Sequence, residues 1–215
     1  MVVPRWLWRL SGWSLALAAA AVAAGAAALV LGTADPPRAG PLLWQDDFKA
    51  GLARWELLSA PGGSADTSGA ALAFTVAPGQ TAYALTAGPT GDFTLEVAGA
   101  AGPGAGEAAY GLVFAWQDPA HYSAVLVSGN GYAEAYTQLG PTRETWFVFQ
   151  QWPHILYGVE SNRVRVDGRG ATVTARVNDE VLAATSAAGG GRVGVLVSSP
   201  AAARVVFSWV RVWTP

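Results

Sequence analysis

The chain has 215 residues, 52% of them hydrophobic, and a formal net charge of -2. This length and apolar content are sufficient for one domain with a full core and an appendage. The sequence has no run rich in Lys or Arg, which excludes the clustered cations that nucleic-acid binding requires. It has no cysteine, which excludes disulfides and thiolate metal sites.

Residues 1–34 predict a membrane-inserted helix. The segment from Leu10 to Gly32 carries no charge and is long enough to cross a bilayer. Arg5 and Arg9 precede it, which favours a cytoplasmic N-terminus and an extracytoplasmic remainder. Two alternatives stay open. The length of the apolar run favours an uncleaved signal anchor in the cell membrane, whereas cleavage near Ala34 would release a secreted protein.

Residues 35–42 predict a stiff, proline-rich linker, and residues 43–215 predict one all-β domain. In this domain, runs with period-two alternation are separated by Gly, Pro, Asn or Asp, and short antiparallel strands in two packed sheets account for this pattern. The predicted strands are Ala71–Val76, Thr81–Thr86, Phe93–Ala98, Tyr110–Gln117, Tyr122–Ser128, Tyr132–Leu139, Trp146–Gln150, Arg163–Asp167, Ala171–Val177, Arg192–Ser198 and Arg204–Trp213. Asn178-Asp179 predicts a two-residue hairpin turn, because both residue types tolerate positive φ.

The alternation also assigns the faces of the strands. In one strand, the bulky set predicted to face the core is Tyr110, Leu112, Phe114 and Trp116. In another, the set predicted to face the core is Ala171, Val173, Ala175 and Val177, with Thr172, Thr174 and Arg176 facing water.

Several motifs resemble the concanavalin A-like, laminin G-type jelly-roll modules of bacterial surface proteins. They are "DDF" at Asp46–Phe48 followed by Trp55, "YGLVFAWQDPAHYSAVLVSGNGY" from Tyr110, "GVESNRVRVDGRGATVTARVNDEVL" from Gly158, and the closing "VGVLVSS" and "VVFSWVRVW". The likeness covers nearly all of residues 43–215. It implies an antiparallel two-sheet jelly-roll sandwich that is usually non-catalytic and binds sugars or partner proteins, although glycoside hydrolases share the fold.

The residues offer little support for catalysis. Retaining glycosidases need two carboxylates about 5 Å apart, whereas Glu96 and Glu134 stand singly on different predicted strands. His121 and His154 lie next to turn residues, and no Gly-x-Ser-x-Gly motif occurs. We therefore predict no catalytic residue.

A ligand-binding face is predicted instead. Period two places Tyr132, Glu134, Tyr136 and Gln138 on one side of a strand, with Trp146 and Trp152 following nearby. Aromatic planes with amide and carboxylate groups beside them suit sugar rings, which have an apolar side and a belt of hydroxyls. The same stripe is also compatible with packing against a loop or a protein partner.

No cofactor is predicted. Asp46 and Asp47 are weak candidates for a structural calcium site, and they also suit a capping role at the first strand. Members of the resembled family often carry Asp or Asn where this chain has Ser208 and Trp209, which removes one possible calcium ligand.

The sequence therefore predicts a non-catalytic, membrane-anchored, extracytoplasmic β-sandwich that binds a glycan or a protein partner, with residues 10–32 in the membrane. Two alternatives stay open. One is an accessory subunit of a membrane protein complex, held by its single helix. The other is a glycoside hydrolase of the glucanase-like fold.

Overall fold

The structure is a computed structural model that describes residues 5–30, 35–59, 63–67, 69–186 and 191–215, with helix side chains described from residue 13 onward. The chain divides into two compact units, residues 1–39 and residues 40–215. Each unit is described by itself.

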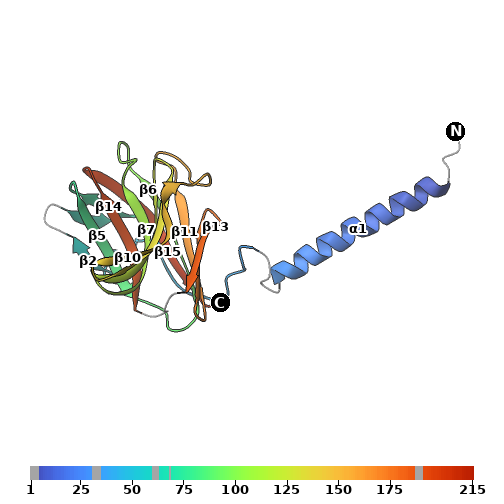
Figure 1. Ribbon diagram of the computed structural model, residues 1–215, viewed down its shortest axis with the longest axis horizontal. Coiled ribbons are helices and arrows are strands. Elements are labelled where there is room, and N and C mark those ends of the chain that lie inside the picture. The colour runs from blue at the N-terminus through green and yellow to red at the C-terminus, as the bar shows by residue number, and fades with distance from the viewer. Residues whose placement is uncertain (1–4, 31–34, 60–62, 68, 187–190) are drawn as a thin grey trace. The chain divides into compact units, whose positions relative to one another are not determined.

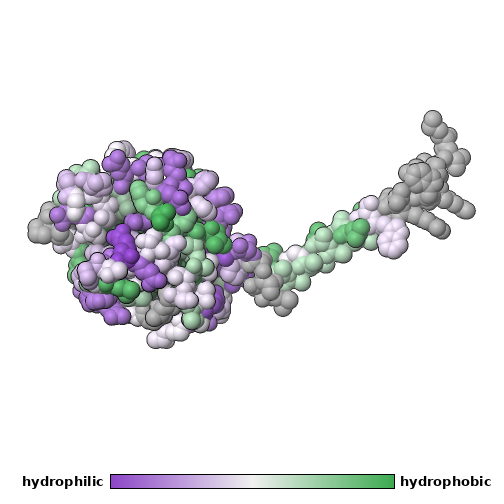
Figure 2. All heavy atoms as spheres, viewed as in Figure 1, coloured by the Kyte–Doolittle hydropathy of each residue, from purple (hydrophilic) through white to green (hydrophobic). Residues whose placement is uncertain are grey.

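The first unit contains helix α1 (Arg5–Val30). Its segment Trp13–Val30 is long and apolar enough to cross a membrane, a property that signal sequences share. Large side chains such as Leu17 and Val22 are exposed, and the described part of the helix appears in green and pale shades in Figure 2. A helix that is apolar all round is typical of a segment that inserts into lipid.

The second unit is an antiparallel β-sandwich of the jelly-roll type, in which two sheets lie face to face (Figure 1). One sheet has eight strands: β1 (Leu42–Asp46), β3 (Ser64–Thr67), β4 (Leu72–Val76), β6 (Phe93–Ala101), β11 (Asn162–Arg169), β12 (Thr172–Val177), β13 (Glu180–Ser186) and β15 (Ala203–Trp213). The other has seven: β2 (Glu56–Ser59), β5 (Gln80–Ala87), β7 (Ala109–Asp118), β8 (His121–Ser128), β9 (Tyr132–Leu139), β10 (Thr142–Gln151) and β14 (Arg192–Ser199). The predicted fold class is confirmed.

The strand order brings distant parts of the chain together. The eight-stranded sheet runs β13-β12-β11-β6-β15-β4-β3, with β1 as an eighth strand beside β15. The seven-stranded sheet runs β10-β9-β8-β7-β14-β5-β2. β15 pairs with β6 along one edge and with both β4 and β1 along the other. The last strand of each sheet in sequence, β15 or β14, is therefore an interior strand.

The core lies between the sheets and follows the predicted alternation. Val164 and Val166 of β11 point inward, as do Val125 and Val127 of β8. We call the side of each sheet that faces this core the inner face and the other side the outer face. Burying one such aliphatic side chain contributes about 1.5–3 kcal/mol, so the shared core supplies most of the stabilisation.

The predicted turn at Asn178-Asp179 is confirmed. It joins β12 to β13, and both residues have positive φ, 50° and 77°. β13, which follows this turn, is absent from the predicted strands. So are β1, β2 and β3. They have four or five residues each and are largely exposed, so their sequences show no clear apolar alternation.

The predicted inward position of Trp116 is wrong. Tyr110, Leu112 and Phe114 face the core, but Ala115 adopts a φ of 49° and the pairing of β7 shifts after Phe114. This bulge places Trp116 on the outer face, where it is 3% exposed and packs with other aromatic rings. An inserted residue reverses the side to which later residues point.

The two ends of the sandwich differ in what they carry. Gly40 and Thr214 are joined by a backbone hydrogen bond of 3.1 Å, and we call this end the linker end. Trp213 pairs there with Thr94, and the neighbouring Phe93 ring contacts Phe114 across the core. The turns at residues 102–108 and 129–131 lie at the opposite end.

The motif "DDF" followed by Trp55 has a structural explanation. Asp46 accepts hydrogen bonds from Phe48 N (2.7 Å) and from Trp55 Nε1 (2.9 Å). The Trp55 ring packs on Trp44 and Phe48, with centroids 6.1 and 5.7 Å away. Asp47 pairs with Lys49 at the surface instead. Among the described residues, no group of three or more His, Asp or Glu side chains is placed to hold a metal ion.

Asp46→Ala should therefore destabilise the domain by about 2 kcal/mol, because two hydrogen bonds to a carboxylate are lost and the indole N–H is left without its partner. Asp47→Ala, a matched control at the adjacent exposed carboxylate, should change stability little. The measurement is chemical unfolding of the full chain in detergent, followed by tryptophan fluorescence. Equal effects of the two substitutions would contradict this role for Asp46.

Candidate functional site

The predicted ligand-binding residues of β9 do share one face. Ala133 and Ala135 belong to the core, so Tyr132, Glu134 and Tyr136 point to the outer face of the seven-stranded sheet. Tyr136 joins three rings from β5, β7 and β8 in what we call the outer aromatic cluster: Tyr83, Trp116, Tyr122 and Tyr136.

The rings of this cluster leave little aromatic surface open. Tyr83 and Trp116 lie 4.6 Å apart between centroids, and Tyr122 and Tyr136 lie 6.0 Å apart. Tyr136 is only 3% exposed, and the Arg143 guanidinium lies 3.7 Å from its ring centroid. Arg143 therefore occupies the position in which a sugar would stack on Tyr136.

Arg143 also forms an ion pair with the carboxylate of Glu134. Its Nη1 lies 3.4 Å from Glu134 Oε2, and its Nε donates a hydrogen bond of 3.4 Å to Gln138 Oε1. Burial raises the pKa of Glu134 above its usual value of 4.5, and the charge of Arg143 opposes that rise. Arg143, Glu134 and Gln138 thus form one polar group at the margin of the outer aromatic cluster.

The other predicted aromatic residues lie elsewhere. Tyr132 stacks on Phe149 with centroids 4.8 Å apart. Trp146 packs against Phe114 at the edge of the core, and Trp152 contacts Phe147 and also lies against the core. The structure therefore brings Glu134, Tyr136 and Gln138 together and separates Trp146 and Trp152 from them.

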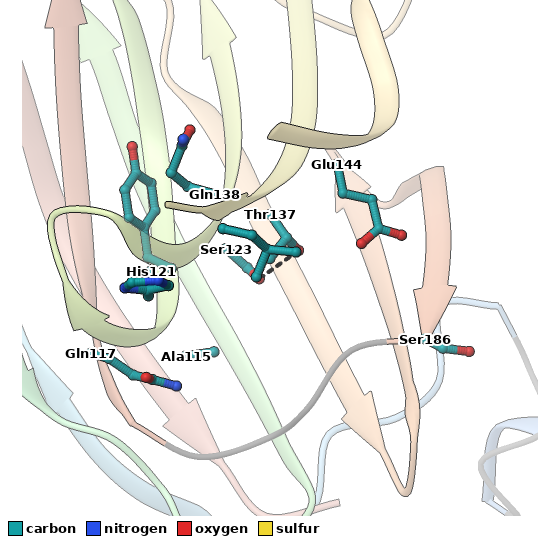
Figure 3. Close-up of a pocket in the computed structure, with 10 residues that line it drawn as sticks. Ala115, Gln117, His121, Ser123, Thr137, Gln138, Glu144 and Ser186 are labelled. Carbon is teal, nitrogen blue, oxygen red and sulfur yellow. Dashed lines mark hydrogen bonds between the residues drawn. The ribbon is translucent and has the colours of Figure 1, made fainter. Parts of the chain in front are cut away.

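A pocket of about 260 Å³ opens at the linker end of the sandwich, and we call it the end pocket. Its lining residues come from the ends of five strands: Ala115, Gln117, His121, Tyr122, Ser123, Thr137, Gln138, Leu139, Glu144 and Ser186. Figure 3 shows Ser123 and Thr137 between His121 and Gln117 on one side and Glu144 and Ser186 on the other.

The end pocket exists because two strands change from apolar to polar along their inner faces. In β8 the inner series is Val127, Val125 and then Ser123. In β9 it is Ala133, Ala135 and then Thr137. The Ser123 and Thr137 hydroxyls lie 3.0 Å apart and form a hydrogen bond across the two strands. The sequence contained this signal as hydroxyl residues at positions that period two assigns to the core.

His121 is held in place at the rim of the end pocket. Its Nδ1 lies 2.9 Å from both carboxylate oxygens of Asp118, and Ala120 N donates a hydrogen bond of 2.7 Å to the same carboxylate. These hydrogen bonds, that of His121 first, lower the pKa of Asp118. Because Nδ1 faces Asp118, the other ring nitrogen is the one left for a ligand. His154 lies apart from this group, beside Trp152.

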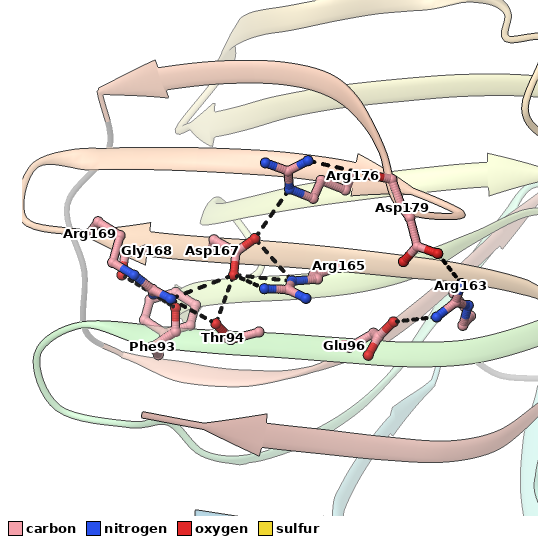
Figure 4. A network of polar contacts seen from close by, with 10 residues as sticks. All are labelled: Phe93, Thr94, Glu96, Arg163, Arg165, Asp167, Gly168, Arg169, Arg176 and Asp179. Atoms are coloured by element: carbon pink, nitrogen blue, oxygen red, sulfur yellow. Dashed lines mark hydrogen bonds and ion pairs between the residues drawn. The ribbon is translucent and has the colours of Figure 1, made fainter. Parts of the chain in front are cut away.

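The outer face of the eight-stranded sheet carries a second polar group, a buried ionic network centred on Asp167 (Figure 4). Thr94 Oγ1 donates a hydrogen bond of 2.7 Å to Asp167, and Arg165 donates through Nη2 at 2.7 Å. Arg176 Nε lies 3.4 Å from the other carboxylate oxygen. Arg176 points away from the core as predicted but is only 6% exposed, because this network covers it; the expectation that it faces water is wrong.

Glu96 lies in the same network and is its second buried carboxylate. It pairs opposite Arg165 while Thr94 pairs opposite Asp167, so both carboxylates lie on one face of neighbouring strands. Burial raises the pKa of Glu96, and Arg163 and Arg165 oppose that rise. Arginines contact both oxygens of Asp167, so this carboxylate is not free to act on a substrate.

Comparison with known proteins supports the fold. No family model and no curated protein matches the sequence. A carbohydrate binding module, CBM66 from Bacillus subtilis, superposes with a TM-score of 0.60 at 14% identity over 76% of this chain and 97% of that one. The GH43 BlXynB protein from Bacillus licheniformis gives 0.62 at 14% identity over 80% of this chain but only 39% of that one.

A third solved structure, a protein of unknown function with a galectin-like fold from Bacillus subtilis, has a TM-score of 0.57 at 11% identity and covers 82% of this chain and 97% of that one. In each of the three, the part that superposes on this chain is a β-sandwich of the jelly-roll type. At these identities the likeness establishes the fold and leaves the function to be argued from the residues.

The partly buried Glu134 should make stability pH-dependent. The folded-state pKa of Glu134 is raised above the ordinary value of 4.5. The contribution of Glu134 to the free energy of unfolding is therefore complete below pH 4.5 and is lost as the pH rises through the raised pKa. Glu134→Gln removes this loss, so the variant should gain stability relative to the wild type between about pH 4 and pH 7. Arg143→Met should steepen the loss, because it removes the opposing charge. Chemical unfolding across this pH range measures both effects, and a Glu134→Gln difference that is constant with pH would contradict the assignment.

Proposed function

We propose that the protein is a non-catalytic glycan-binding module that its first helix holds in a membrane. The end pocket is the observation that carries the proposal. It gathers four hydroxyls, two amides, an imidazole and a carboxylate around a small space, with Ala115 and Leu139 as apolar contacts. A few placed polar groups in a partly apolar cavity are typical of sugar sites.

The size of the end pocket indicates how much of a glycan it would hold. Ligand pockets in proteins usually measure about 300–1,000 Å³. At about 260 Å³, the end pocket suits a single sugar ring. A terminal or side-branch unit of a glycan fits this geometry better than the interior of a polysaccharide chain.

The remaining polar groups support a non-catalytic role. The Asp167 carboxylate is fully engaged by arginines, and Glu134 by Arg143. A retaining glycosidase needs two carboxylates about 5 Å apart on either side of the scissile bond, both accessible to the substrate. In this proposal, Tyr136 and Glu134 position β9 and β10, and Gln138 reaches the end pocket at its rim.

Thr137→Val tests the site. It removes one hydroxyl from the end pocket and leaves that of Ser123 without its partner, so affinity for the bound glycan should fall by about fivefold. Thr174→Val is the matched control, since Thr174 is a half-buried threonine on the outer face of the other sheet. Binding is measured with the full chain in detergent against a panel of soluble oligosaccharides.

The same panel discriminates the end pocket from the outer face. Retained binding in Thr137→Val together with lost binding in Tyr132→Ala would move the site to the aromatic face of β9 predicted from the sequence. Absence of binding to every glycan in the panel would refute the proposed function.

Membrane attachment is tested on the native protein. A retained helix α1 predicts that the protein stays in the membrane pellet after alkaline carbonate extraction and keeps its first residues. N-terminal sequencing checks this directly. A mature protein that begins near Asp35 would show that the segment is a cleaved signal peptide.

A further inference from the structure

The end pocket has an uneven charge. Of its ten lining residues, Glu144 is the one with a formal charge when histidine is neutral, and none is Lys or Arg. Across the end pocket from Glu144, His121 turns its Nδ1 toward a second carboxylate, that of Asp118. Among the described lining residues, a ligand therefore meets the Glu144 carboxylate and no cation.

The alternation of β10 produces this imbalance. Arg143 and Glu144 are consecutive, so their side chains point to opposite faces. Arg143 lies over Tyr136 and beside Glu134 on the outer face, whereas Glu144 lines the end pocket from a position paired with Thr137. In the described part of the chain, Arg143 touches the lining of the end pocket only through Gln138, whose Oε1 accepts a hydrogen bond of 3.4 Å from Arg143 Nε, and its guanidinium is held by Tyr136 and Glu134.

The arginines of the ionic network do not correct the imbalance. Arg165, Arg169 and Arg176 lie on the outer face of the eight-stranded sheet, where Asp167 holds them. The end pocket is lined by inner-face residues of the other sheet, Ser123, Thr137 and Glu144 among them, with Tyr122 and Gln138 at its margin. These cations and the Glu144 carboxylate therefore belong to different surfaces.

We propose that the end pocket selects a sugar that carries a protonated amine, with Glu144 as its counter-charge, and disfavours acidic sugars. This inference rests on the proposed function and adds the chemical class of the ligand. A neutral sugar can use the hydroxyl, amide and imidazole groups alone. An amino sugar gains an ion pair with Glu144, whereas a uronic acid would place its carboxylate beside Glu144 with no cation among the lining residues.

The expected selectivity is moderate because Glu144 is exposed to solvent. At about pH 7, where a sugar amine is largely protonated, each step from amine to neutral sugar to acid should lower affinity by about fivefold. Higher salt should reduce both differences in affinity, because the interaction between exposed charges is screened.

The test compares methyl glycosides of glucosamine, glucose and glucuronic acid, and the same three forms in the galactose series. Their dissociation constants are measured by saturation-transfer NMR on the full chain in detergent. Glu144→Gln should bring the three affinities of a series together. Glu107→Gln, the matched control, changes an exposed carboxylate in a turn at the opposite end of the sandwich and should keep the wild-type order.

The outcomes separate the two proposals. Binding with equal affinity for the three forms, or an order that Glu144→Gln leaves unchanged, overturns the charge selection and leaves glycan binding in place. Failure of all six sugars and of the oligosaccharide panel to bind overturns both.

Discussion

Apolar side chains such as Val125, Val166 and Val195 meet between the two sheets, and every other feature of the domain depends on this contact. Because side chains alternate along a strand, the residues that fill the core determine which of their neighbours point outward. A shift of one residue in β9 would bury Glu134 and expose Ala135. Burial of the core thereby fixes the positions of the polar groups that are available for binding.

This constraint explains why the fold could be predicted and parts of the site could not. Period two identified most of the long strands, and the residue types of Asn178 and Asp179 identified the turn between two of them. It did not predict the position of Trp116, because a bulge at Ala115 depends on backbone geometry that an alternating pattern does not encode. It grouped Trp146 with Tyr136 by nearness in the chain, whereas Trp146 packs against Phe114.

The end pocket shows a different limit of sequence analysis. Ser123 and Thr137 are hydroxyl residues at core positions of predicted strands, and this departure from the apolar pattern is visible in the sequence. Their partners in the pocket, Gln117, Glu144 and Ser186, come from three other strands, and only the pairing of those strands brings them together. Arg176 is a similar case: its outward direction was predictable, but its burial depends on Asp167 in the neighbouring strand. In such a buried ion pair, the cost of removing both charges from water offsets much of their mutual attraction.

The interior positions of β14 and β15 have a consequence for how the domain folds. One edge of each of three strands, β6, β4 and β1, can be paired only after β15 has been synthesised. One edge of β7 and one edge of β5 depend on β14 in the same way. Neither sheet can be completed before β14 and β15 have been synthesised. Such non-local pairing is slow and leaves strand edges open to wrong partners in the meantime. Each sheet therefore stays incomplete for most of the time that the domain is being synthesised.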